Sequence, residues 1–164
     1  MTTDTLIATL ADAHALTPTA APQAHPLLQR LVREHQAEWV TLAGLSAWQQ
    51  AAPGHAVLLV AGDAVRFPEG LDVAVVLPEL ARSLGASWRT GIALASEEDA
   101  IASRFGAQRR PSLIFLRDGR YATTVSGMHD WPEFVALVQA ALVHPTGPAP
   151  LAIRAEGAGA SSCH

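Results

Sequence analysis

The feature that most constrains the fold is an apolar run at residues 55–61, His-Ala-Val-Leu-Leu-Val-Ala, which carries no acid and no arginine. A run of this length suits a β-strand. A strand that is apolar at successive positions, instead of at alternate ones, is covered on both faces. We therefore expect a central strand that lies between two layers of helices.

The segments around this run alternate between helical and strand patterns. Asp72 is expected to cap the helix that follows the central strand, Ser96 with Asp99 the next one, and Asp130 with Glu133 the last. A turn at Asp118-Gly119 joins the last two strands. Apolar spacing predicts helices at 27–38, 45–51, 72–85, 96–106 and 131–143, and strands at 39–42, 55–61, 88–94, 112–116 and 121–126.

From the first strand onward the order is β-α-β-α-β-α-β-β-α, which predicts an α/β fold with a mixed central sheet flanked by helices on both faces. The length of 164 residues suits one domain. Three prolines in residues 17–26 indicate a linker, and residues 146–164 are rich in Gly, Ala, Ser and Pro. We expect a flexible extension at 1–26, a domain at 27–143 and a disordered tail at 144–164.

Composition excludes several classes of function. The formal net charge of −4 argues against a nucleic-acid partner, and no apolar stretch is long enough to insert into a membrane. The seven histidines lack the short paired spacing of a metal site. We therefore expect no metal, no cofactor and no catalytic residues.

The chain has a single cysteine, Cys163, near its end. Thiol–disulfide exchange needs one thiol to attack and a second to resolve the mixed disulfide, so the pair is missing. No disulfide framework exists, and no basic residue precedes Leu6 as an export signal would require. A reducing cytoplasm is the expected location.

Six short segments within residues 39–143 follow one another in a recognisable order and spacing: residues 57–61, Leu77-Pro78-Glu79-Leu80, Arg104-Phe105-Gly106, Pro111, Asp118-Gly119 and Gly127. In this order and spacing the chain resembles a thioredoxin, although the Cys-x-x-Cys motif of that fold is absent. The resemblance implies a thioredoxin-like fold and a cis peptide bond between Arg110 and Pro111.

A narrower resemblance lies in four segments: Ser103-Arg104-Phe105-Gly106, residues 109–115, Gly119-Arg120-Tyr121 and residues 127–133. The earlier segments Glu38-Trp39-Val40 and Leu45-Ser46-Ala47-Trp48 also fit. In these segments the chain resembles the HyaE/HupG/HoxO family of accessory proteins for [NiFe]-hydrogenases. The resemblance implies a non-catalytic cytoplasmic chaperone that binds the precursor of the uptake hydrogenase small subunit, with its twin-arginine signal peptide, before export. Other hydrogenase accessory proteins are further implied partners.

The thioredoxin resemblance also implies where a partner peptide lies: across the loop after the central strand, the loop before the cis proline and the loop before the last helix. Carboxylates of the first loop are expected to pair with the guanidinium groups of the signal peptide. The alternative is that they belong to a solvated loop and a helix cap. The residues that these loops place in the candidate site are Asp63, Glu69, Asp72, Arg109, Arg110, Pro111, Met128 and His129.

Other charged and aromatic residues near these loops have two interpretations. Arg109 and Arg110 repel an arginine-rich ligand, so they contact an acidic or backbone group of the partner or face water. Trp131 either forms a surface with His129 or packs the last helix onto the sheet, and the core position is favoured. The acids at 97–99 are assigned to structure because they begin a helix.

Two rival functions stay open at this stage. One is a thioredoxin-like enzyme that uses Cys163 as its only nucleophile, although this thiol lies far from any helix N-terminus that lowers its pKa. The other is a general protein-interaction module with an unrelated client.

Overall fold

The computed structural model describes residues 23–150, which fold around a mixed five-stranded sheet. Strands β1, β3 and β2 run parallel, whereas β4 is antiparallel to β2 and β5 is antiparallel to β4. The predicted α/β architecture with a mixed sheet is confirmed. In their order across the sheet, the strands are β1 (Glu38–Val40), β3 (Arg89–Ala93), β2 (His55–Val60), β4 (Ser112–Arg117) and β5 (Arg120–Ser126).

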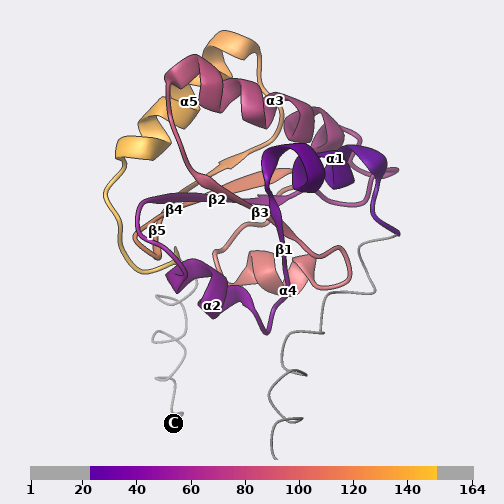
Figure 1. Cartoon of the computed structure of the whole chain (residues 1–164), viewed down its shortest axis with the longest axis horizontal. Coiled ribbons are helices and arrows are strands. Elements are labelled where there is room, and N and C mark those ends of the chain that lie inside the picture. Colours follow the sequence, from indigo (N-terminus) through magenta and orange to yellow (C-terminus); the bar gives the residue numbers. More distant parts are fainter. Residues whose placement is uncertain (1–22, 151–164) are drawn as a thin grey trace, which may run out of the picture.

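Helices cover both faces of this sheet (Figure 1). One face carries α1 (Pro26–His35), α3 (Glu69–Leu84) and α5 (Trp131–Val143), and the other carries α2 (Leu45–Gln50) and α4 (Glu98–Ser103). The chain therefore leaves β2 toward α3 on one side of the sheet, and leaves the adjacent strand β3 toward α4 on the other.

The central strand β2 supplies both layers of the core. Val57 and Leu59 belong to the apolar cluster under α1, α3 and α5, whereas Leu58 and Val60 belong to the cluster over α2 and α4. All four side chains are fully buried. Because successive side chains of a strand point to opposite faces, an apolar run is what a doubly covered strand requires, as predicted.

Two backbone features expected from the sequence are present. The Asp118-Gly119 turn joins β4 to β5 with positive φ angles of 52° and 78°, and the carboxylate of Asp118 accepts a hydrogen bond from the Gly54 N–H at 2.7 Å. The peptide bond between Arg110 and Pro111 is cis.

The predicted caps of α3 and α4 are wrong. Helix α3 begins at Glu69, after Pro68, so Asp72 lies within its first turn. Proline is well placed at a helix start because its missing N–H has no partner there anyway. Helix α4 begins at Glu98, beyond Ser96, and no side chain caps it.

The cap of α5 is only partly as expected. Asp130 occupies the N-cap position without a side-chain hydrogen bond to the helix. Glu133 reaches His129 instead, with 3.5 Å between Oε1 and Nδ1.

Contacts of the fold reach beyond residues 27–143 at both ends. The imidazole Nδ1 of His25 accepts a hydrogen bond from the Leu27 N–H at 3.2 Å, so this residue of the expected extension starts α1. At the other end, Gly147 forms a β-bridge with Tyr121. Cys163 and the rest of the predicted extension and tail lie outside the described residues. Within residues 23–150, none of the helices is both long and apolar enough for a membrane span.

Candidate functional site

Three loops meet at one end of the sheet, as the resemblance implied. The strand register aligns Val60 at the end of β2 with Ser112 at the start of β4 and Ser126 at the end of β5. Two hydrogen bonds join the second loop to the third: the Gly127 N–H donates to the Pro111 carbonyl at 2.8 Å, and the hydroxyls of Ser112 and Ser126 lie 3.0 Å apart. We call this region the three-loop end.

The first loop and the first turn of α3 present three exposed acids, Asp63, Glu69 and Asp72, which we call the acid row. One carboxylate oxygen of Asp63 accepts hydrogen bonds from the N–H groups of Val65 and Arg66, at 3.1 and 3.0 Å, and thereby shapes the loop. Glu69 and Asp72 lie three residues apart in the first turn of α3 and therefore on one side of it. Within residues 23–150 the carboxylates of these two residues have no hydrogen bond or ion pair.

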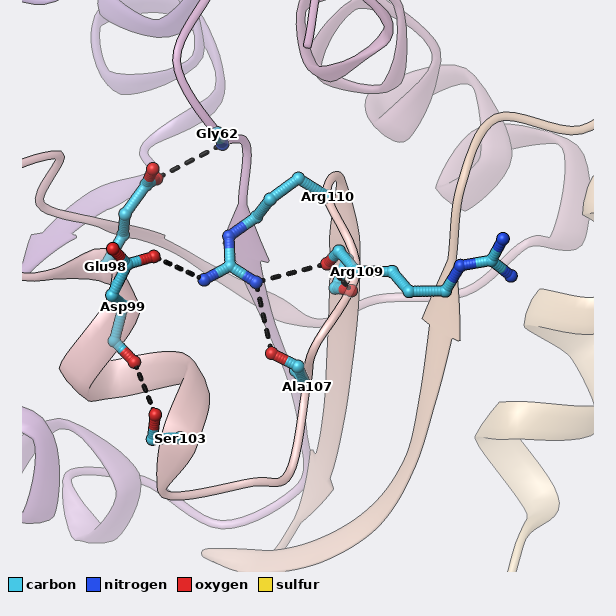
Figure 2. Close-up of polar contacts among 8 residues, drawn as sticks. Gly62, Glu98, Asp99, Ser103, Ala107, Arg109 and Arg110 are labelled. Carbon is cyan, nitrogen blue, oxygen red and sulfur yellow. Dashed lines mark hydrogen bonds and ion pairs between the residues drawn. The ribbon is translucent and has the colours of Figure 1, made fainter. Parts of the chain in front are cut away.

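The neighbouring arginines before the cis proline point in opposite directions (Figure 2). The guanidinium of Arg110 is 2.8 Å from a carboxylate oxygen of Asp99 and donates to the carbonyls of Ala107 and Arg109, at 3.1 and 3.2 Å. Its side chain is 10% exposed. Arg109 is exposed and extends away from this cluster. Arg110 therefore does not offer its charge to a partner as expected, and Pro111 is buried.

The acids at the start of α4 bind three different loops; we call Glu97, Glu98 and Asp99 the acid clasp. Glu97 accepts a hydrogen bond from the Leu42 N–H at 2.8 Å, and Glu98 accepts one from the Gly62 N–H at 3.1 Å (Figure 2). Asp99 pairs with Arg110. The three acids have the structural role expected for them, although they act through these contacts with other loops.

The environment of Glu98 affects its ionisation. Burial raises the pKa of this carboxyl above its usual value, while the Gly62 hydrogen bond and the charge of Arg110 oppose the increase. Burial disfavours the ionised form because the protein solvates it less well than water does.

The third loop exposes apolar side chains. Met128 is 40% exposed and Trp131 is 44% exposed, so the predicted core position of Trp131 is wrong. His129 is held by the Ser126 carbonyl, 2.8 Å from its Nε2, and lies edge-on to Phe134. These two apolar side chains are therefore open to solvent just before and at the start of α5.

A pocket of about 700 Å³ lies beside the first loop, where β2 and β3 end. Its wall includes Leu28 of α1, Trp39 of β1, Leu71 of α3 and Asp63 of the acid row. The sequence gives no signal of this pocket because each of its apolar residues follows an ordinary core pattern. Among residues 23–150 no group of three or more His, Cys, Asp or Glu side chains is placed to hold a metal ion.

Comparison with known proteins gives a consistent match. A family model described as "Hydrogenase-1 expression protein HyaE" matches residues 27–134. The hydrogenase expression/formation protein HoxO of Cupriavidus necator is 50% identical in an alignment of 143 residues that covers 85% of this chain and 88% of that protein. The HoxO protein of Azotobacter vinelandii is 36% identical over 118 residues, which are 72% of this chain and 78% of that protein.

A solved thioredoxin structure shows the fold of this chain. A mutant thioredoxin from Halobacterium salinarum superposes with a TM-score of 0.52 at 18% identity, covering 65% of this chain and 90% of its own. The predicted thioredoxin-like fold is confirmed. A hydrogenase expression/formation protein hupG from Rhodopseudomonas palustris is 32% identical, with a TM-score of 0.45, covering 64% of this chain and 94% of its own.

Proposed function

The chain belongs to the HyaE family of hydrogenase expression proteins, and on that basis we propose that it is a non-catalytic cytoplasmic chaperone for the precursor of a hydrogenase small subunit. It binds the twin-arginine signal peptide of this precursor at the three-loop end and holds the client before export. Membership of the family supports a role in hydrogenase maturation, and the exposed acids of the three-loop end support binding of a basic peptide there.

The observation that carries the proposal is the acid row. Asp63, Glu69 and Asp72 are exposed at the end of the sheet where the loops meet, and two of the three carboxylates have no partner within residues 23–150. A guanidinium group binds a carboxylate through charge-assisted hydrogen bonds that are often bidentate. Two adjacent arginines therefore find at least two free acceptors on one short segment of this protein.

The inward position of Arg110 removes an objection to this proposal. Two outward-facing arginines beside the acid row repel a basic peptide, but Asp99 and two carbonyls take up the charge of Arg110. Arg109 alone remains at the surface of this loop, and it extends away from the Arg110 cluster (Figure 2). Arg66 of the first loop is exposed as well, so the three carboxylates of the acid row face two outward guanidinium groups and keep the larger charge at the three-loop end.

The apolar residues at the same end supply a second type of contact. Val65, at 89% exposure, projects from the first loop, and Met128 and Trp131 project from the third. Exposed aromatic side chains are frequent anchors in protein interfaces. The mature part of the client, or the apolar part of its signal, has a surface to bind beside the acids.

A binding role without catalysis is supported by the thiol content. The chain has no second cysteine to resolve a mixed disulfide, and Cys163 lies far beyond α5 in the sequence. The rival thiol enzyme therefore lacks a resolving group within one chain.

Titration of the full chain with small-subunit precursor and with the same subunit lacking its signal peptide tests the proposal. Isothermal calorimetry is expected to show binding of the precursor and at least tenfold weaker binding of the truncated form. Equal affinity for both would overturn recognition through the signal peptide. The acid-row variant described in the Discussion assigns the binding to the three-loop end.

A further inference from the structure

The pocket beside the acid row lies where an α/β sheet forms a crevice. The chain leaves β2 toward α3 on one face and leaves β3 toward α4 on the other (Figure 1). Adjacent parallel strands whose connections diverge in this way open a crevice outside their carboxyl ends, and ligands of such folds bind there. The volume of about 700 Å³ is well above that of a packing defect and within the range of ligand pockets.

The chemistry of the wall is apolar with an acid at one side. Leu28, Trp39 and Leu71 come from three different elements and are partly exposed, so part of their apolar surface is left uncovered. Among the described residues of the wall only His25 and Asp63 are ionisable, and none is an arginine. The pocket therefore suits an apolar group that is followed or preceded by a cation.

One segment of the chain, residues 63–72, contributes both to the acid row and to the wall of the pocket. Asp63 belongs to both, and Leu71 of the wall stands between Glu69 and Asp72 in the sequence. A peptide whose basic residues pair with the acid row consequently has its next residues at the mouth of the pocket. An export signal has this layout, because a basic stretch precedes an apolar run of about 7–15 residues.

Resting on the proposed function, we propose that this pocket is the subsite for the apolar run that follows the arginines of the signal peptide. The acid row binds the charges and the crevice buries the apolar side chains, which is favourable because apolar surface leaves water. The two parts together distinguish an export signal from other basic peptides, which lack the apolar run.

The test uses two synthetic peptides and the full chain. One peptide has two adjacent arginines followed by about ten apolar residues, and the other has the same arginines followed by serines. Wild type is expected to bind the apolar peptide at least tenfold more tightly. Ala95 is exposed and lines the pocket, so Ala95→Trp fills the space without disturbing the core. This variant is expected to lose the preference and to keep its affinity for the serine peptide.

A matched control is Ala136→Trp, which adds the same side chain at an exposed position of α5 outside the pocket. It is expected to keep the tenfold preference. Methyl NMR signals of Leu28 and Leu71 are expected to shift with the apolar peptide in wild type and not in Ala95→Trp. An unchanged preference in Ala95→Trp would overturn the pocket as the subsite.

The remaining outcomes separate this inference from the proposed function. If wild type binds both peptides equally, the arginines are recognised and the apolar subsite is wrong. If neither peptide binds, recognition of the signal peptide fails as well. If the apolar peptide binds only after removal of residues 1–22, the chain's own N-terminal segment occupies the pocket, which overturns the proposal for the full chain.

Discussion

The acid clasp and the acid row contain the same residue types at the same end of the sheet, yet their carboxylates differ in whether they have partners within the protein. Glu97 and Glu98 accept backbone N–H groups, and Asp99 pairs with Arg110. In the acid row, Glu69 and Asp72 have no partner within residues 23–150. An acid therefore has a structural role where the fold places a hydrogen-bond donor beside it. Where the fold places no donor beside it, its carboxylate remains available to a partner protein.

The largest expected effect comes from removing the central contact of the clasp. Glu98→Ala leaves the Gly62 N–H without its acceptor, and we expect the free energy of unfolding to fall by about 2 kcal/mol. Urea denaturation measures this. Glu69→Ala, the matched change in the acid row, is expected to stay within about 0.5 kcal/mol of wild type. A similar loss in both variants would contradict the distinction between the two sets.

Peptide affinity, in contrast to stability, is expected to depend on the acid row and not on the acid clasp. The triple variant Asp63→Asn, Glu69→Gln and Asp72→Asn is expected to bind a twin-arginine peptide about tenfold more weakly, equivalent to about 1.4 kcal/mol. The Asp63→Asn change keeps an oxygen acceptor for the loop, so the thermal midpoint is expected to change little. Labelled-peptide titration at low and high salt measures the affinity, and the difference between wild type and variant is expected to shrink with salt.

The control for that titration is the double variant of the acid clasp, Glu97→Gln with Asp99→Asn, measured at a temperature at which it is folded. It removes two negative charges beside α4 and leaves the acid row unchanged. Its affinity for the peptide is expected to match that of wild type. If it weakens binding as much as the triple variant does, general negative charge and not the acid row attracts the peptide.

Substitution of the two adjacent arginines is expected to give a smaller difference in stability. Arg110→Met leaves the Ala107 and Arg109 carbonyls without their guanidinium donor, and we expect a loss of about 1 kcal/mol in the free energy of unfolding. The Asp99 ion pair adds little because the Asp99 side chain is 95% exposed. Arg109→Met is expected to leave stability unchanged. Equal destabilisation by the two variants, measured by thermal denaturation, would place Arg109 inside the fold as well.

The smallest expected effect is a pH dependence. Because burial raises the pKa of Glu98 in the folded state above its ordinary 4.5, the folded chain holds this proton more tightly than the unfolded chain does. The contribution of Glu98 to stability is therefore complete below pH 4.5 and decreases as the pH rises through its folded pKa. Glu98→Gln keeps an oxygen for Gly62 and does not titrate. The stability of this variant relative to wild type is expected to increase between about pH 4 and about pH 7, and a constant difference would contradict the raised pKa.

Much of the fold was predictable because its signals are local. The apolar run of β2, the Asp118-Gly119 turn and the span of α5 each depend on residues close in sequence. The convergence of the three loops and the cis bond before Pro111 came from the family resemblance, since spacing alone does not show them.

The contacts of the site were harder to predict because their partners are far apart in sequence. Leu42 is 55 residues from Glu97, and Gly62 is 36 residues from Glu98. Trp131 shows a different limit. It is on the same face of α5 as the buried Phe134, but it begins the helix at the end of the sheet and is left exposed. The helical spacing of apolar residues predicts which side of the helix a residue lies on. It does not predict whether the sheet extends far enough to cover that residue.

The β-bridge between Gly147 and Tyr121 affects how copies of this protein meet one another. Strand β5 is an edge of the sheet, and its unpaired backbone groups are a template for another strand. The returning chain covers the start of that edge, with the Gly147 N–H donating to the Tyr121 carbonyl at 2.8 Å, and the β4–β5 register is shifted nearby, between Phe115 and Leu116. Both features disfavour edge-to-edge aggregation. This matters for the binding role proposed above, because a covered edge makes the sheet less prone to recruit a second copy of the chain or an extended segment of a bound protein.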